Sequence, residues 1–122
     1  VHSREPGQNM QILEAAITVD ELRKIAEATF GDIVKAVVDT DRQLIALDAE
    51  LHSDLEAMLL GNGSEQNSLW GINLYPDLTD EDFIEFDSLI NIRPSQGNKT
   101  RSVDSKDIQK KIRTIVNRWI RH

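Results

Sequence analysis

Two runs of residues within positions 69–94 alternate between apolar and polar side chains. The inner face is shared by Trp70, Ile72 and Leu74 in the first run and by Ile84, Phe86, Ser88, Ile90 and Ile92 in the second. A period of two is typical of strands with one buried face. Pro76 ends the first run, because it has no N–H group for a strand ladder. The pattern therefore predicts a β-hairpin whose second strand covers Phe83–Ile92, with a polar face open to ligands.

The residues after Thr18 repeat apolar side chains at helical spacing. Thr18 and Glu21 form a capping-box pattern, in which each side chain binds the other residue's backbone N–H. Glycine is a typical helix end. We therefore expect an amphipathic helix that begins after Thr18, carries Phe30 in its apolar stripe and ends at Gly31.

Two later stretches have the same helical spacing. Asp48 is placed to cap a helix that ends at Gly61, and Asp104 or Ser105 is placed to cap a last helix that continues to Ile120. The apolar stripe of the last helix is the most regular in the chain. We expect each helix to pack this stripe against the core.

Three further apolar stretches, Met10–Ile17, Ile33–Asp39 and Leu44–Leu47, are predicted to be strands. The order is then strand, helix, strand, strand, helix, strand, strand, helix. We predict a single α+β domain over residues 10–122, in which a largely antiparallel sheet of four or five strands packs against helices. Trp70 and Trp119 should lie in or beside the core. The first six elements match the order of a ferredoxin-like split βαβ unit, with the last two as additions.

Composition narrows the class of protein. The 122 residues suit one domain and contain no cysteine, which excludes disulfide bonds and thiolate metal sites. No apolar run is long enough to span a membrane and no signal-peptide pattern opens the chain, so we expect a soluble cytoplasmic protein. Val1–Asn9 has no periodicity and is interpreted as a disordered extension or expression remnant outside the fold.

The net charge of -7 argues against general nucleic-acid binding, which depends on cationic side chains. The charge is uneven, however. Residues 1–98 hold six Lys and Arg against nineteen Asp and Glu, which gives -13, whereas residues 99–122 hold eight against two, which gives +6. The basic segment is either a solvated helix face directed at the acidic body or a neighbouring subunit, or a local anion site.

The first candidate site is Glu50, His52 and Asp54, as catalytic acid–base groups or metal ligands. Histidine suits proton transfer and metal binding near neutral pH. The spacing differs from the helical HExxH metal motif, and residues two apart on a helix diverge. The alternative is structural: Asp48 caps the helix and the acidic residues favour its N-terminal dipole.

Two further candidates lie later in the chain. The polar face of the hairpin carries Asn73, Tyr75, Glu85, Asp87, Asn91 and Arg93, and Ser88 interrupts its apolar row. The loop 93–101 places Arg93, Lys99 and Arg101 around a Gly97-Asn98 turn, which suits a phosphate or carboxylate. The ligand-binding candidates are therefore Asn73, Tyr75, Ser88, Arg93, Asn98 and Arg101.

Several strings occur together in this chain: Glu50-Leu-His52-x-Asp54, Gly63-Ser64, Leu69-Trp-Gly71, Tyr75-Pro76 and Ser88-Leu-Ile-Asn-Ile-Arg-Pro-Ser-Gln-Gly-Asn98. Their combination resembles a family of small, uncharacterised prokaryotic proteins that carry a domain of unknown function. The resemblance covers most of residues 33–120. It implies that these positions matter together, and it implies no reaction.

Three functions are compatible with these patterns. The first is a binding or interaction module that self-associates, because charge is asymmetric and the predicted strand Phe83–Ile92 needs a partner at any exposed edge. Its ligand would be a small molecule or an anion, and no cofactor is indicated. The second is a metal-assisted hydrolase using Glu50, His52 and Asp54. The third is anion or nucleic-acid binding through a continuous patch formed by Arg93, Lys99, Arg101, Lys106 and Lys110.

Overall fold

The computed structural model describes residues 9–122, so the predicted extension lies outside the described residues except for Asn9. Within them the elements are β1 Gln11–Ile12, β2 Ile17–Thr18, α1 Val19–Glu27, β3 Val34–Asp39, β4 Leu44–Leu47, α2 His52–Gly61, β5 Leu69–Leu74, β6 Ile84–Glu85, α3 Lys106–Trp119 and β7 Ile120–Arg121. Short 3-10 turns cover Gln66–Ser68, Asp80–Phe83, Leu89–Asn91 and Pro94–Gln96. The α+β class is as predicted.

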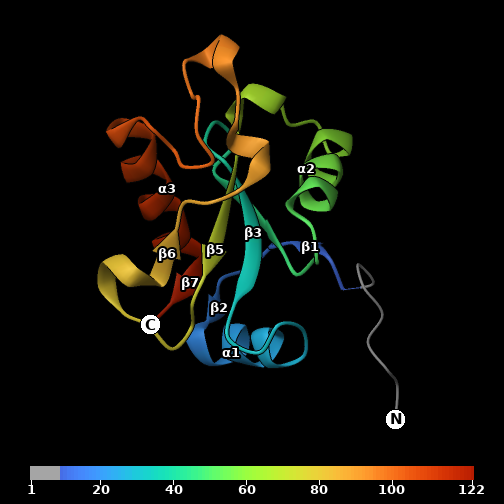
Figure 1. Cartoon of the computed structure of the whole chain (residues 1–122). Helices are drawn as coiled ribbons and strands as arrows, with labels where there is room; N and C mark the ends of the chain where they lie inside the picture. The colour runs from blue at the N-terminus through green and yellow to red at the C-terminus, as the bar shows by residue number, and fades with distance from the viewer. Residues whose placement is uncertain (1–8) are drawn as a thin grey trace.

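The main sheet has the order β1-β4-β3-β5-β6, with antiparallel neighbours throughout. A second, smaller sheet pairs β2 with β7 in parallel. Helices α1 and α3 pack on one face of the main sheet, and α2 packs on the other face (Figure 1). Trp70 lies in the larger core and Trp119 packs against it, as predicted. Among the described residues, no helix has the length and apolarity to cross a lipid bilayer.

The main sheet matches the predicted ferredoxin-like order only in strands β1, β4 and β3. Strands β1 and β3 run parallel with β4 between them, and α1 lies on the connection, as in a split βαβ unit. The next strand, β5, joins the sheet beside β3, whereas a ferredoxin-like core would place it beside β1. The lengths explain this choice, because β3 offers a six-residue edge and β1 offers only two residues.

The second hairpin strand was predicted wrongly. Strand β6 contains only Ile84–Glu85, and the chain then turns away from the sheet. Ser88 causes the turn, because its hydroxyl accepts a hydrogen bond from the Ile90 N–H and caps a 3-10 turn. The long exposed edge that was expected to require a second copy is therefore absent from the described residues.

Strand β5 is buried on both faces, so the prediction of a solvent-facing polar side is also wrong for this strand. Its residues Trp70, Ile72 and Leu74 face the core under α1 and α3, as predicted. Helix α2 and the segment 86–98 cover the opposite face. Leu69 packs with the core of α2, and Asn73 is only 6% exposed.

Several boundaries also differ from the prediction. The stretch Met10–Ile17 forms two short strands in different sheets, because the chain bends after Leu13 and turns that side chain into the core. Helix α1 is capped by Thr18, whose hydroxyl accepts from the Glu21 N–H at 3.1 Å, as predicted. It ends at Glu27, however, so Phe30 lies beyond the helix and is 44% exposed.

The N-cap of α2 is Leu51, and Asp48 instead lies upstream in a left-handed conformation with φ of 80°. The predicted Asp48 cap is therefore wrong, because the chain needs three more residues to reach the start of the helix. Helix α3 is capped by Ser105, one of the two predicted residues. Ile120 leaves the helical stripe and pairs with Ile17 in the small sheet.

Candidate functional site

A pocket of about 470 Å³ lies between the start of α2 and strands β3, β5 and β6, and we call it the His52 pocket. Its chemically active lining groups are Lys35, His52, Asn73, Glu85, Asp87 and Arg101. Its apolar wall is formed by Ile33, Leu51, Leu89 and Ile90. The pocket unites residues from three separate sequence predictions, since His52 comes from the first candidate, Asn73 from the hairpin and Arg101 from the loop 93–101.

His52 begins α2 and is only 9% exposed. Its Nε2 lies 2.8 Å from the carbonyl oxygen of Ile72, and since a carbonyl can only accept, Nε2 donates and Nδ1 is left as the acceptor. Burial lowers the pKa of His52, and the charge of Lys35 lowers it further. The Ile72 carbonyl, the nearby Asn73 side chain and the charge of Asp87 oppose this effect without reversing it. The imidazole is therefore neutral at pH 7.

Asn73, on β5, lies in the same pocket as His52. The nitrogen of its side-chain amide is hydrogen-bonded, whereas the oxygen is not. The Nδ2 group donates to Glu85 Oε1 at 2.8 Å and to the Asp87 carbonyl at 3.3 Å. These two acceptors fix the orientation of the amide. The Oδ1 atom is buried and has no hydrogen-bond partner among the described residues. The pocket thus contains an unsatisfied acceptor.

Glu85 is also bound by Tyr75, whose hydroxyl donates to Oε1 at 3.0 Å. Partial burial raises the pKa of Tyr75, and the bond to Glu85 and its charge raise it further, so the phenol keeps its proton. Tyr75 does not line the pocket itself, but its hydrogen bond helps to position the Glu85 carboxylate.

The two cationic groups at the pocket each contact a residue other than His52 and Asn73. Arg101 Nε donates to Asp87 Oδ1 at 2.7 Å, and the Lys35 ammonium lies 5.4 Å from the centre of the Phe30 ring. Neither cation neutralises the acceptors of His52 and Asn73. Hydrogen-bond acceptors thus dominate the floor of the pocket.

Ser88 lines the pocket but has a packing role. A Cβ atom on Gly71 would lie 2.5 Å from Ser88 Cβ and 2.6 Å from its Oγ, so the serine occupies the space that only glycine leaves open. Its Oγ accepts from the Ile90 N–H at 3.3 Å. Ser88 therefore positions the segment that closes the pocket.

The other two ligand candidates, Arg93 and Asn98, are structural. Arg93 is 8% exposed, donates to the Leu69 carbonyl, and lies 4.8 Å from the Trp70 ring and 3.6 Å from a Glu56 oxygen. Burial lowers the pKa of Arg93, and Glu56 opposes this. Arg93 therefore does not contribute to the exposed basic patch that the sequence predicts from Arg93 to Lys110.

Asn98 is buried and organises the loop 93–101. Its amide nitrogen donates to the carbonyls of Asn91 and Ser102 at 2.7 Å and of Thr100 at 3.1 Å, and its Oδ1 accepts from the Asp104 N–H at 2.7 Å. Both ends of its side-chain amide are therefore hydrogen-bonded inside the protein. This arrangement gives Asn98 a structural role in the loop.

The structure does not bring Glu50, His52 and Asp54 together. Glu50 is exposed before α2 and Asp54 is exposed in its first turn, whereas His52 is buried against β5. Across residues 9–122 no three His, Asp or Glu side chains are arranged as a metal site. The metal-assisted hydrolase lacks its proposed ligand set among these residues.

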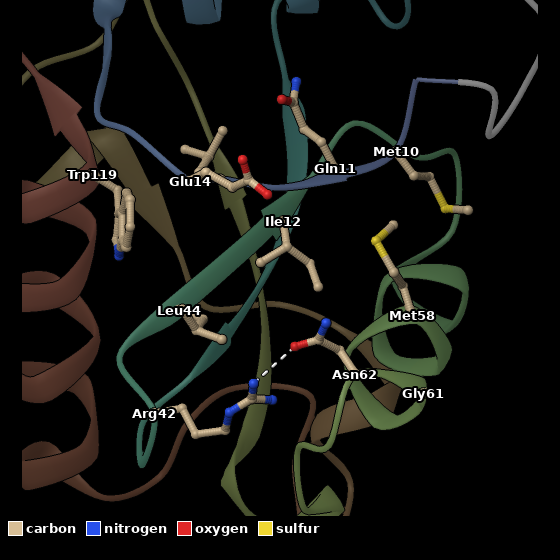
Figure 2. Close-up of a pocket in the computed structure, with 11 residues that line it drawn as sticks. Met10, Gln11, Ile12, Glu14, Arg42, Leu44, Met58, Gly61, Asn62 and Trp119 are labelled. Carbon is tan, nitrogen blue, oxygen red and sulfur yellow. Dashed lines mark hydrogen bonds between the residues drawn. The ribbon is translucent and has the colours of Figure 1, made fainter.

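Lys35 was missed at the sequence level. It is the one charged residue in the apolar run Ile33–Val38, and a charge within a buried strand was the available signal. A second hollow was missed as well. It has a volume of about 770 Å³, lies along β1 and is lined by Met10, Ile12 and Met58 among others (Figure 2).

Two polar residues of this second hollow, Arg42 and Asn62, are joined by a hydrogen bond. Arg42 donates to Asn62 Oδ1 at 2.8 Å, as drawn in Figure 2, and to Ser64 Oγ at 2.9 Å. The hollow is larger than the His52 pocket, but none of the buried side-chain atoms that lack a hydrogen-bond partner among the described residues belongs to its lining. We regard the His52 pocket as the better candidate site.

Comparison with known proteins identifies a family but no function for the pocket. A family model described as "Protein of unknown function (DUF5674)" matches residues 11–119. No curated protein and no solved structure matches the chain.

Proposed function

This chain belongs to the protein family of unknown function DUF5674, and on that premise we propose that it binds a small polar ligand in the His52 pocket. The observation that carries the proposal is the buried, unpaired Oδ1 of Asn73 beside the neutral imidazole of His52. A buried acceptor without a partner costs about 1–3 kcal/mol. A ligand that donates a hydrogen bond there would remove this cost.

The acceptors of the pocket define the ligand's chemistry. His52 Nδ1, Asn73 Oδ1 and the Glu85 carboxylate all accept hydrogen bonds, so the matching ligand presents ammonium, amide N–H or hydroxyl groups. Leu51 and Leu89 are 55% and 67% exposed at the rim and would contact the apolar part of such a ligand. Polar anchors within an apolar wall are typical of small-molecule sites.

The test uses ethanolamine, acetamide and ribose as probes of the three donor types. Amide NMR spectra of the full chain are recorded during titration, and we expect at least one probe to shift the Asn73 side-chain signals and those of His52. Asn73→Ala should weaken this binding about tenfold, which is the effect of one lost hydrogen bond to a buried acceptor. Asn67→Ala, an exposed asparagine outside the pocket, is the matched control.

Two outcomes would contradict the proposal. One is that none of the three probes shifts signals at the pocket. The other is that Asn73→Ala and Asn67→Ala bind the probes equally well. Circular dichroism of each variant separates lost binding from lost folding.

We also propose that the protein is cytoplasmic, prokaryotic and self-associating, as its sequence indicates. Support for self-association now comes from the exposed Leu51 and Leu89, which together form an apolar rim. Light scattering after size exclusion tests it: Leu89→Ser should shift the chain toward the monomer. A wild-type chain that is monomeric at high concentration would contradict this part of the proposal and leave the ligand proposal standing.

A further inference from the structure

A third hollow, of about 680 Å³, runs between α3 and the turn that joins β3 to β4, and we call it the α3 groove. It shares no lining residue with the His52 pocket. Its charged groups are Lys110, Lys111 and Arg118, with Asp107 as a single opposing carboxylate, so the groove carries a net charge of +2. This is a local excess of positive charge on a chain with a net charge of -7.

The three cations of the groove have no acidic partner. Within residues 9–122, ion pairs join Arg23, Arg93 and Arg101 to carboxylates, and none involves Lys110, Lys111 or Arg118. Lys111 and Arg118 are seven residues apart, about two turns along one face of α3, and Lys110 precedes Lys111. An anion bound among these cations would therefore meet positive charge that no ion pair among the described residues already takes up.

The opposite wall of the groove is fixed to α3. Arg118 Nη1 donates to Gln43 Oε1 at 2.8 Å, and Trp119 Nε1 donates to the Gln43 carbonyl at 2.9 Å. Gln43 itself has φ of 58°, the left-handed conformation of a tight turn. The turn therefore holds the Arg118 guanidinium in place in a groove that Lys110 and Lys111 also line. Thr40 and Thr114 also line the groove, but their hydroxyl groups donate to the carbonyls of Ser68 at 3.2 Å and Lys110 at 3.1 Å, so the positive charges are the groups left to bind an anion.

We propose that the α3 groove binds a compact ligand that carries two or more phosphate groups. An arginine fork binds phosphate oxygens in pairs, and lysines supply point charges that adjust to them. The volume falls within the range of small-molecule sites. A long polyanion fits less well, because the net charge of -13 on residues 1–98 repels its remaining length.

The test measures binding of inorganic pyrophosphate to the full chain by calorimetry, with Trp119 fluorescence as a second signal. The variant Lys110→Gln with Lys111→Gln removes two groove charges. The matched control, Lys99→Gln with Lys106→Gln, removes two charges from outside the groove lining. We expect pyrophosphate to bind the wild type and the control similarly, and the groove variant at least tenfold more weakly.

Three results would overturn the inference. The first is no binding of pyrophosphate at millimolar concentration. The second is an equal loss in both variants, which would mean that net charge alone attracts the anion. The third is tighter binding of a single-stranded oligonucleotide than of pyrophosphate, with a steeper dependence on salt, which would assign the groove to nucleic acid. Each result is independent of the His52 pocket.

Discussion

At the residue scale, Asn91 takes the place of a missing strand. Its Oδ1 accepts from the Gly71 N–H at 2.8 Å, and its Nδ2 donates to the carbonyls of Gly71 and Arg101 at 2.9 Å. Asn91 is fully buried. One side-chain amide thus satisfies the backbone edge of β5 where β6 has ended.

We predict that Asn91→Ala lowers the free energy of unfolding by about 2–4 kcal/mol, because it leaves buried backbone groups of Gly71 without partners. Urea denaturation followed by circular dichroism measures the change. Asn117→Ala, at an exposed position of α3, should change it by less than about 0.5 kcal/mol. Equal effects of the two variants would mean that the amide bridge adds no stability.

His52 should make stability depend on pH. Its pKa is lowered from 6.5 in the folded state, so the unfolded state binds the proton more readily between the two values. The stability that the protein gains from a neutral His52 is therefore fully present above about pH 6.5, and it declines as the pH falls toward the pKa of His52 in the folded state. We predict that wild type loses more stability than His52→Gln between pH 8 and pH 5. Parallel urea titrations at the two pH values would show no such difference if His52 titrated normally.

At the element scale, the segment 86–92 crosses β5 through a contact that requires glycine. We predict that Gly71→Ala destabilises the fold by about 1–3 kcal/mol, because the new Cβ would lie 2.5 Å from Ser88 Cβ. Adding Ser88→Gly should restore part of the loss. Thermal denaturation compares the single and double variants.

The control is Gly61→Ala in α2, where no atom lies within 4 Å of the added Cβ. This change should be neutral or stabilising, since alanine favours helix. A Gly71→Ala variant as stable as Gly61→Ala would contradict the close crossing.

Elements with local signals could be predicted from the sequence. The cap at Thr18, the apolar strands β3 and β4 and the stripe of α3 depend on neighbouring residues, and all were found. The prediction of the second hairpin strand was wrong for a physical reason. The alternation placed Ile92 on the inner face and Asn91 on the polar face, whereas Ile92 is 42% exposed and Asn91 is fully buried. Residues 86–92 instead pack on β5 through Ser88 and Asn91, and their backbone belongs to no strand.

The site could be predicted only in parts. His52 and Asn73 were both candidates, but they were assigned to different surfaces, because their proximity depends on how α2 packs across β5. Arg93 was assigned to an anion site by its charge. Its burial over Trp70 depends on a loop conformation that charge does not report.

At the scale of the whole molecule, the small sheet joins distant parts of the chain. Strand β7 lies beside β2, with Ile120 opposite Ile17 in parallel register (Figure 1). Ile120 is fully buried in the larger core. We predict that Ile120→Ala costs about 2–4 kcal/mol in urea denaturation. Arg121→Ala, in the same strand but exposed, should cost less than about 0.5 kcal/mol, and a similar cost for both would mean that β7 contributes little.

The pairing of β2 with β7 also sets an order of events during biosynthesis. During translation β2 emerges from the ribosome early, whereas its partner β7 emerges only after the strands of the main sheet and α3 have been synthesised. Contacts between such distant segments form slowly, since a long loop must close first. Until that moment Ile17 and the neighbouring core remain accessible to chaperones, so the nascent chain should be most vulnerable to proteolysis just before Ile120 leaves the exit tunnel.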